Sequence, residues 1–152
     1  MSNAVKVTDY DPDTIVITVN GTPISGYADG TFVSVERDED SWTTVVGSQG
    51  EVARARSRNL SGKITLTLMQ TSASNALLEG LMIADDAAQQ GQFVVSIADT
   101  NYKGICLSDS SWIVKPAILS YGRELEDREW TIQCARIEYL GAYGQESNPE
   151  PS

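Results

Sequence analysis

The sequence of 152 residues contains no histidine. Histidine is the commonest general base and the commonest neutral metal ligand, so catalytic sites of the Ser-His-Asp or Cys-His kind are excluded. Cysteine is almost as scarce, with only Cys106 and Cys134 present. Two cysteines cannot form a zinc site alone, and a free cysteine behaves as a small apolar side chain. We therefore expect two buried thiols, with one disulfide as the alternative, and neither a metal nor a cofactor.

Basic residues and long apolar runs are also scarce. Lys and Arg number 11 against 21 Asp and Glu, which gives a formal net charge of −10. An acidic surface of this size repels phosphates and argues against a general DNA- or RNA-binding role. No apolar run approaches the ~20 residues that span a bilayer, and the first residues lack the basic-then-apolar layout of a signal peptide. We expect a protein that stays in a cytoplasm or is released from one.

Alternating apolar and polar residues dominate the chain and predict a mainly β fold. Residues 14–19, 31–36 and 41–46 are expected to form an antiparallel meander, with a hairpin turn at Asn20-Gly21. Further strands are expected at residues 63–70, 92–98, 103–107, 112–119 and about 129–140. The sequence thus predicts two packed antiparallel sheets, as a β-sandwich or partly closed barrel with one flanking α-helix. Residues 1–140 would form this single domain.

One segment has the periodicity of a helix, at about residues 72–84. Ser72 is a suitable N-cap, and apolar residues recur on one stripe at Leu77, Leu78, Leu81 and Met82. These four residues are expected to pack the helix against a sheet. Residues 141–152 lack apolar bulk and are expected to form a flexible tail.

Residues 47–61 are predicted to form a long loop, and long loops in compact domains are usually functional. The loop contains Arg54, Arg56 and Arg58, separated by small residues. In an extended segment these arginines project from the same side. They are either solvated or form a subunit contact, because arginine pairs well with carboxylates at interfaces.

Carboxylate clusters are the only candidates for catalysis. They comprise Glu36, Asp38, Glu39 and Asp40, and then Glu124, Glu126, Asp127 and Glu129. Paired carboxylates hydrolyse glycosides only when a cleft holds them apart at a fixed spacing. Both clusters lie in polar turns beside arginines, which favours solvated turns over a hydrolase without histidine. A carbohydrate- or receptor-binding β-sandwich is the stronger alternative, because Trp42, Trp112 and Trp130 could supply an aromatic face.

Four stretches of the sequence resemble a family of tail tube proteins from contractile-tailed bacteriophages. They read YDPD (10–13), GYADGTFVSVE (26–36), GSQGEVARARS (47–57) and SGKITLTLMQTSASN (61–75). The resemblance extends over roughly residues 8–140. It implies a structural virion protein rather than an enzyme. Six subunits would join their inner sheets into a β-barrel ring, and the rings would stack into a tube.

The resemblance also implies partners and a location. The partners would be further copies of the chain and the sheath, tape measure, baseplate and terminator proteins of the tail. Double-stranded DNA would pass through an acidic lumen without specific binding, and assembly in the host cytoplasm would precede residence in the virion. Residues of the long loop would then join successive rings by meeting an acidic turn of the next ring. The predicted contact residues are Gly47, Gly50, Glu51, Arg54, Arg56 and Arg58, with Glu36, Asp38, Glu39 and Asp40 opposite.

Overall fold

The computed structural model describes residues 11–100 and 104–143. The strands are β1 (Ile15–Val19), β2 (Thr22–Pro23), β3 (Val33–Arg37), β4 (Trp42–Val46), β5 (Val52–Arg56), β6 (Gly62–Met69), β7 (Phe93–Asp99), β8 (Gly104–Lys115), β9 (Asp127–Cys134) and β10 (Glu138–Leu140). A 3-10 turn spans Pro12–Thr14, and the helix α1 spans Ser74–Ala88. Most of the expected C-terminal tail lies outside the described residues, as does Tyr10.

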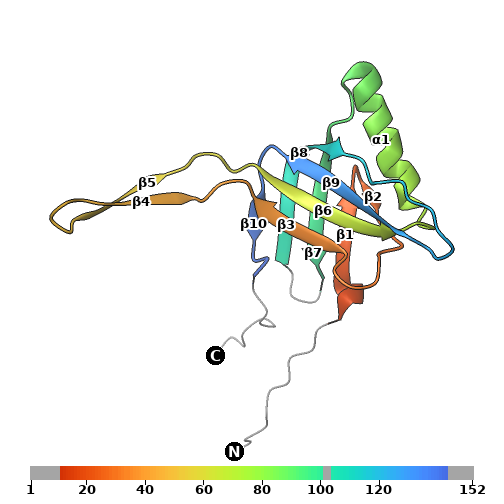
Figure 1. The fold of residues 1–152 in the computed structure, drawn as a ribbon, viewed down its shortest axis with the longest axis horizontal. Coiled ribbons are helices and arrows are strands. Elements are labelled where there is room, and N and C mark those ends of the chain that lie inside the picture. Colours follow the sequence, from red (N-terminus) through yellow and green to blue (C-terminus); the bar gives the residue numbers. More distant parts are fainter. Residues whose placement is uncertain (1–10, 101–103, 144–152) are drawn as a thin grey trace, which may run out of the picture.

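Two antiparallel sheets account for all these strands. The larger has eight strands in the order β2-β1-β7-β8-β9-β6-β3, with β10 paired to β8. The smaller contains β4 and β5 and extends away from the rest of the molecule (Figure 1). These features confirm the predicted fold class, which is mainly β with antiparallel sheets and one helix. The described strands do not close into a barrel.

Alternation along β6 shows how the large sheet forms the core. Ile64, Leu66 and Leu68 are buried on one face, whereas Thr65 and Thr67 lie on the opposite face. The neighbouring strand β9 follows the same pattern and buries Trp130, Ile132 and Cys134. One apolar and one polar face is the arrangement typical of antiparallel sheets. Both cysteines are buried and free, as the first of the two sequence interpretations expects.

The segment after β2 lies along the edge of β6. The turn at Asn20-Gly21 has φ angles of 52° and 79°, as a two-residue hairpin requires. The chain then crosses to β6, where Met69 N–H donates to the Gly26 carbonyl at 2.8 Å. Gly26 has φ +73°, and an added Cβ would lie 2.6 Å from Ser72 Cβ. Residues 26–28 therefore hydrogen-bond to β6, which lies near the opposite end of the strand order from β1. This segment brings the two ends of the open sheet close together.

The predicted meander is wrong. Strand β1 pairs with β2 and β7, β3 pairs with β6, and β4 pairs with β5. Evenly spaced turn signals favour pairing between neighbours, but the pairing here depends on which apolar faces complete the core.

Strand β8 differs from the prediction of two separate strands at residues 103–107 and 112–119. Residues 104–115 form one strand through the expected turn at Asp109, while residues 116–119 lie outside it. A bulge absorbs the change in register, since Phe93 pairs with Ser111 but Val95 pairs with Ser108. The predicted final strand is instead divided into β9 and β10.

The helix α1 begins two residues later and ends four residues later than predicted. Its N-cap position is Ala73, although Ser72 Oγ accepts a hydrogen bond from Ser74 N–H at 3.1 Å. Leu78 is fully buried. Leu77, Leu81 and Met82 are half-buried and pack against the same core. The apolar stripe therefore attaches the helix to the sheet.

Candidate assembly interface

Residues 42–56 form a projecting hairpin, which we call the arm. All ten residues of β4 and β5 are exposed. The prediction of a loop over residues 47–61 is therefore wrong for Val52–Arg56, which pair with Trp42–Val46. Small residues and arginines alternate there, so no apolar pattern marks the segment as a strand. The segment is a strand because its backbone pairs with Trp42–Val46, and this pairing leaves no local signal in the sequence.

The tip of the arm requires two glycines and Glu51. Gly47 N–H donates to the Glu51 carbonyl at 2.7 Å, and Gly50 N–H donates to the Gly47 carbonyl at 3.1 Å. Gly50 has φ +86°, a conformation that other residues adopt only with strain. The Glu51 carboxylate lies where a Cβ on Gly47 would be. These three predicted contact residues thus shape the turn of the arm.

The register divides the arm into two unlike faces. Directly paired residues share a face, so the first face carries Trp42, Thr44, Val46, Val52, Arg54 and Arg56. The second carries Thr43, Val45, Ala53 and Ala55 and has no charge. The Arg54 guanidinium lies 3.7 Å from the centre of the Trp42 ring, a contact that contributes about 0.5–1 kcal/mol at an exposed site. Arg58 lies beyond the end of β5.

The acidic turn lies where the arm joins the large sheet. Asp38 Oδ2 accepts hydrogen bonds from Gln133 Nε2 and Ser61 Oγ, both at 2.9 Å, and Lys63 Nζ lies 3.7 Å from Oδ1. The hydrogen bond from Gln133, followed by that from Ser61, lowers the pKa of Asp38 below its ordinary value. Glu39 Oε2 accepts from Ser57 Oγ at 3.1 Å. Asp38 and Glu39 therefore hold the base of the arm within one subunit.

The other acidic residues of this turn have different surroundings. Asp40 and Arg56 line one shallow depression together with Asp38. Glu36 lies on β3, directly opposite Lys63 of β6, on the polar face of the large sheet. The structure thus places Arg56 near the acidic turn of its own subunit, while Arg54 contacts the indole instead.

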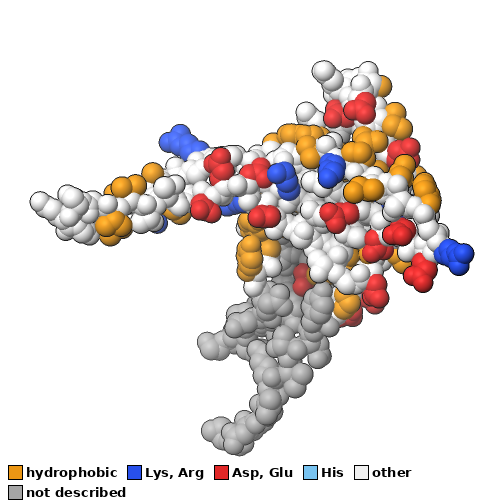
Figure 2. Space-filling view, viewed as in Figure 1, with side chains coloured by type: hydrophobic (Ala, Val, Ile, Leu, Met, Phe, Trp, Pro, Cys, Tyr) orange, Lys and Arg blue, Asp and Glu red, His pale blue; other side chains and the backbone are white. Residues whose placement is uncertain are grey.

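Acidic side chains are spread over the visible face of the molecule, with few basic ones between them (Figure 2). The helix α1 carries Glu79, Asp85 and Asp86 and no basic residue. The polar face of the large sheet adds Glu36 on β3 and Glu129 on β9, beside the threonines of β6. Residues 42–58 differ in sign, because three arginines there outnumber the acids.

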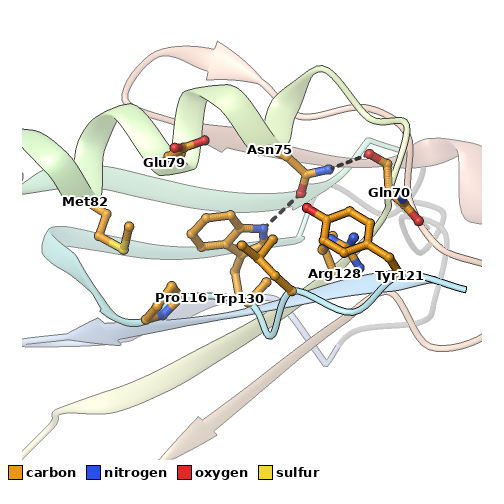
Figure 3. A pocket seen from close by; sticks show the side chains of 10 residues that line it. Gln70, Asn75, Glu79, Met82, Pro116, Tyr121, Arg128 and Trp130 are labelled. Carbon is orange, nitrogen blue, oxygen red and sulfur yellow. Dashed lines mark hydrogen bonds between the residues drawn. The ribbon is translucent and has the colours of Figure 1, made fainter.

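A groove of about 370 Å³ lies between α1 and the segment that follows β8. Trp130 forms one wall, and its Nε1 donates to Asn75 Oδ1 at 3.0 Å (Figure 3). Met82 and Pro116 line the groove as well. Arg128 is only 4% exposed, and one guanidinium nitrogen donates to the Ser120 carbonyl at 3.0 Å. Hydrogen bonds therefore fix Trp130, Asn75 and Arg128 in the groove.

Exposed apolar residues extend from this groove, in residues 118–125. They are Ile118, Leu119, Tyr121 and Leu125, each with between 68% and 74% of its surface exposed. The sequence did not predict this surface, because residues 112–119 were expected to form a strand. The signal was present in Pro116, which cannot donate a hydrogen bond within a ladder.

The second carboxylate cluster is open to solvent. Glu124, Glu126, Asp127 and Glu129 are all exposed, in and beside the turn before β9. In the part of the chain that the structure describes, no three His, Cys, Asp or Glu residues are grouped to hold a metal ion. Within the described residues, α1 lacks the length and apolarity that a membrane-spanning helix needs.

Comparisons with known proteins agree with this architecture. The structural protein ORF10 of Pseudomonas phage KPP10 is 26% identical over 154 residues, which cover 96% of this chain and 89% of that protein. The sheath/tube terminator of an extracellular contractile injection system (PVC, extended state) superposes with a TM-score of 0.64 at 13% identity. That superposition covers 90% of this chain and 99% of the terminator.

A PVC sheath-tube complex has the same fold, with a TM-score of 0.57 and 15% identity over 83% of this chain and 87% of that one. At such low identity these solved structures show the fold alone. The family of the bacteriophage PhiTE tail tube protein matches residues 14–141, which is most of the chain. The chain therefore belongs to the PhiTE tail tube protein family of phage structural proteins.

Proposed function

We propose that this protein is the subunit of a contractile phage tail tube, in which hexameric rings stack around an acidic lumen that conducts DNA. The observation that carries the proposal is the arm, whose ten strand residues are all exposed in the isolated subunit. The subunit would be assembled in the host cytoplasm and reside in the virion tail. The other partners would be the sheath, tape measure, baseplate and terminator proteins.

An isolated two-stranded hairpin is only marginally stable in water, so the arm needs a contact outside its own subunit. Val45, Val46 and Val52 are each more than half exposed. Covering them with a neighbouring subunit would order the arm and shield its strand edges. The arm is therefore the segment we place between successive rings. Because Asp38 and Glu39 accept hydrogen bonds within their own subunit, Arg54 and Arg56 would also use carboxylates outside the acidic turn.

The polar face of the large sheet is the surface we assign to the lumen. Threonines of β6 lie there between Glu36 and Glu129, with Lys63 as the basic residue of that strand. Six copies at −10 would give a ring a formal charge of 6 × −10 = −60. A lumen of this kind repels phosphate and provides no cluster of basic side chains to retain it. DNA could then move through the tube without being held.

Electron microscopy of the purified protein tests this proposal directly. Stacked rings with a central channel are expected, and their assembly should weaken as salt rises because exposed ion pairs are screened. The combined variant Arg54→Ser, Arg56→Ser and Arg58→Ser should keep the circular dichroism of the parent but form short tubes or none. Arg123→Ser with Arg136→Ser is the matched control, since it removes exposed arginines outside the arm. A protein that stays monomeric at high concentration would refute the proposal.

A tube terminator is the second candidate function. Two solved terminators share this fold over nearly their whole length, a PVC terminator over 99% and the terminating cap of an anti-feeding prophage over 95%. A terminator would form single rings that do not stack, which the same micrographs distinguish.

The arrangement of the tryptophans disfavours a carbohydrate-binding module. Trp130 is buried, Trp112 is half-buried, and Trp42 lies under Arg54. They therefore do not form one exposed aromatic face.

A further inference from the structure

We propose that the groove between α1 and residues 116–121 receives the arm of a second copy of this chain. The inference rests on the proposed function, because it names the surface that the arm would contact in an assembly. It goes further in assigning the apolar surface at residues 118–125 to that contact.

The arm cannot reach the groove of its own subunit. The arm extends from one end of the large sheet, and α1 lies at the opposite end (Figure 1). A contact between them must therefore join two copies through unlike surfaces. Such head-to-tail contacts generate rings when the rotation closes and open helical assemblies when it does not. The positions of the two surfaces thus suit an assembly that grows by repetition.

The groove has the properties of a preformed apolar receptor. Its wall at Trp130 is held by a hydrogen bond to Asn75 (Figure 3). Asn75 Nδ2 in turn donates to the Met69 carbonyl at 2.9 Å. Leu119, which lines the groove, is 71% exposed in the isolated subunit. A wall that is already fixed loses little conformational freedom on binding. Removing the exposed Leu119 side chain from water would contribute favourably to the free energy of binding.

The uncharged face of the arm is the one that suits the apolar part of this groove. Val45 lies at its centre and is 58% exposed, directly opposite Ala53. Its other members, Thr43 and Ala55, are also small, so Val45 is the one large apolar side chain that this face can insert. We therefore place Val45 against Leu119.

Charge favours the same pairing. The helix beside the groove carries Glu79, Asp85 and Asp86 without a basic residue. Residues 42–58 carry Arg54, Arg56 and Arg58 against Glu51 as the acid. Opposite charges on two surfaces speed their encounter and favour one register over others. Arg54 and Arg56 lie on the arm face opposite Val45, so the arm would be attracted to the helix through its net positive charge and not through direct ion pairs.

Cross-linking of mixed single-cysteine variants tests the contact. The native thiols are buried, so Val45→Cys mixed with Leu119→Cys presents one reactive thiol per chain. A short bismaleimide should link the two variants in assembled protein. Replacing Leu119→Cys with Val94→Cys, a position on β7 that is 46% exposed, gives the control. Docking raises the local thiol concentration to the millimolar range, so we expect about a hundredfold more product than from the control at micromolar protein.

Charge reversal provides a second measurement. Glu79→Arg and Arg54→Glu should each slow formation of the Val45–Leu119 product, and added salt should reduce the difference between each variant and the parent. Tubes or rings with product no greater than in the control would overturn this inference and leave the proposed function intact. Failure of the parent protein to assemble would refute the proposed function, and this inference with it.

Discussion

Replacing Leu78 with alanine tests whether α1 is an integral part of the core. Leu78 has 0% of its surface exposed and belongs to the core cluster that includes Leu68 and Trp130. Leucine-to-alanine changes at such sites lower the free energy of unfolding by about 2.7–5 kcal/mol, depending on how far the cavity collapses. We expect about 3 kcal/mol, toward the lower end of this range, because Leu77, Leu81 and Met82 still pack the helix against the core. That loss is a large fraction of the ~5–15 kcal/mol that stabilises a typical domain.

Urea unfolding, followed by circular dichroism, measures this loss. With a slope of about 2 kcal/mol per M, the midpoint should fall by about 1.5 M. Ile83→Ala is the control on the same helix, because Ile83 is 54% exposed and its truncation should change stability by only about 0.5 kcal/mol. Measurements belong at low protein concentration, where subunits do not assemble. Equal midpoints for the two variants would refute the assignment of Leu78 to the core.

Three further predictions concern thiols, a glycine and a carboxylate. Burial, and next the nearby Cys134, raise the pKa of Cys106 to about 11, so a thiol reagent at pH 8 should label the protein only after unfolding; rapid labelling of the folded protein would contradict this. Gly26→Ala should lower stability more than Gly21→Ala, because both glycines have positive φ but only at Gly26 would the new methyl meet Ser72; equal melting temperatures would exclude that contact. The pKa of Asp38 is lowered in the folded state, so its contribution to stability is complete above the ordinary pKa of 3.8 and is lost as pH falls through the folded pKa. Asp38→Asn should therefore make the free energy of unfolding fall less steeply in acid, and an unchanged acid profile would argue against the hydrogen bonds from Gln133 and Ser61.

Much of the fold could be predicted from the sequence because its signals are local. The alternation in β6 and β9, the turn at Asn20-Gly21 and the apolar stripe with Leu78 each depend on residues close together in the chain. Each also coincides with burial in the structure. Fold class and the number of helices followed from the same signals.

The arm and the groove could not be predicted, because each depends on contacts between distant residues. Val52–Arg56 form a strand only through pairing with Trp42–Val46, and the alternating arginines conceal this. Asp109 lies inside β8 because neighbouring strands continue past it, although its own segment has the composition of a turn. The groove combines Trp130, Asn75 and Leu119 from three separate segments. No single stretch of sequence contains such a site.

The separation of the arm from α1 makes the subunit directional. One end of the molecule presents an exposed hairpin, and the other presents the helix with its acidic side chains (Figure 1). An open head-to-tail assembly of such subunits, or a stack of rings joined in this way, has two chemically different ends. Growth at one end would consume free arms, whereas growth at the other would consume free grooves, so the two rates need not be equal. A protein that caps one end would not fit the other, and the polarity of the whole filament would already be present in a single chain.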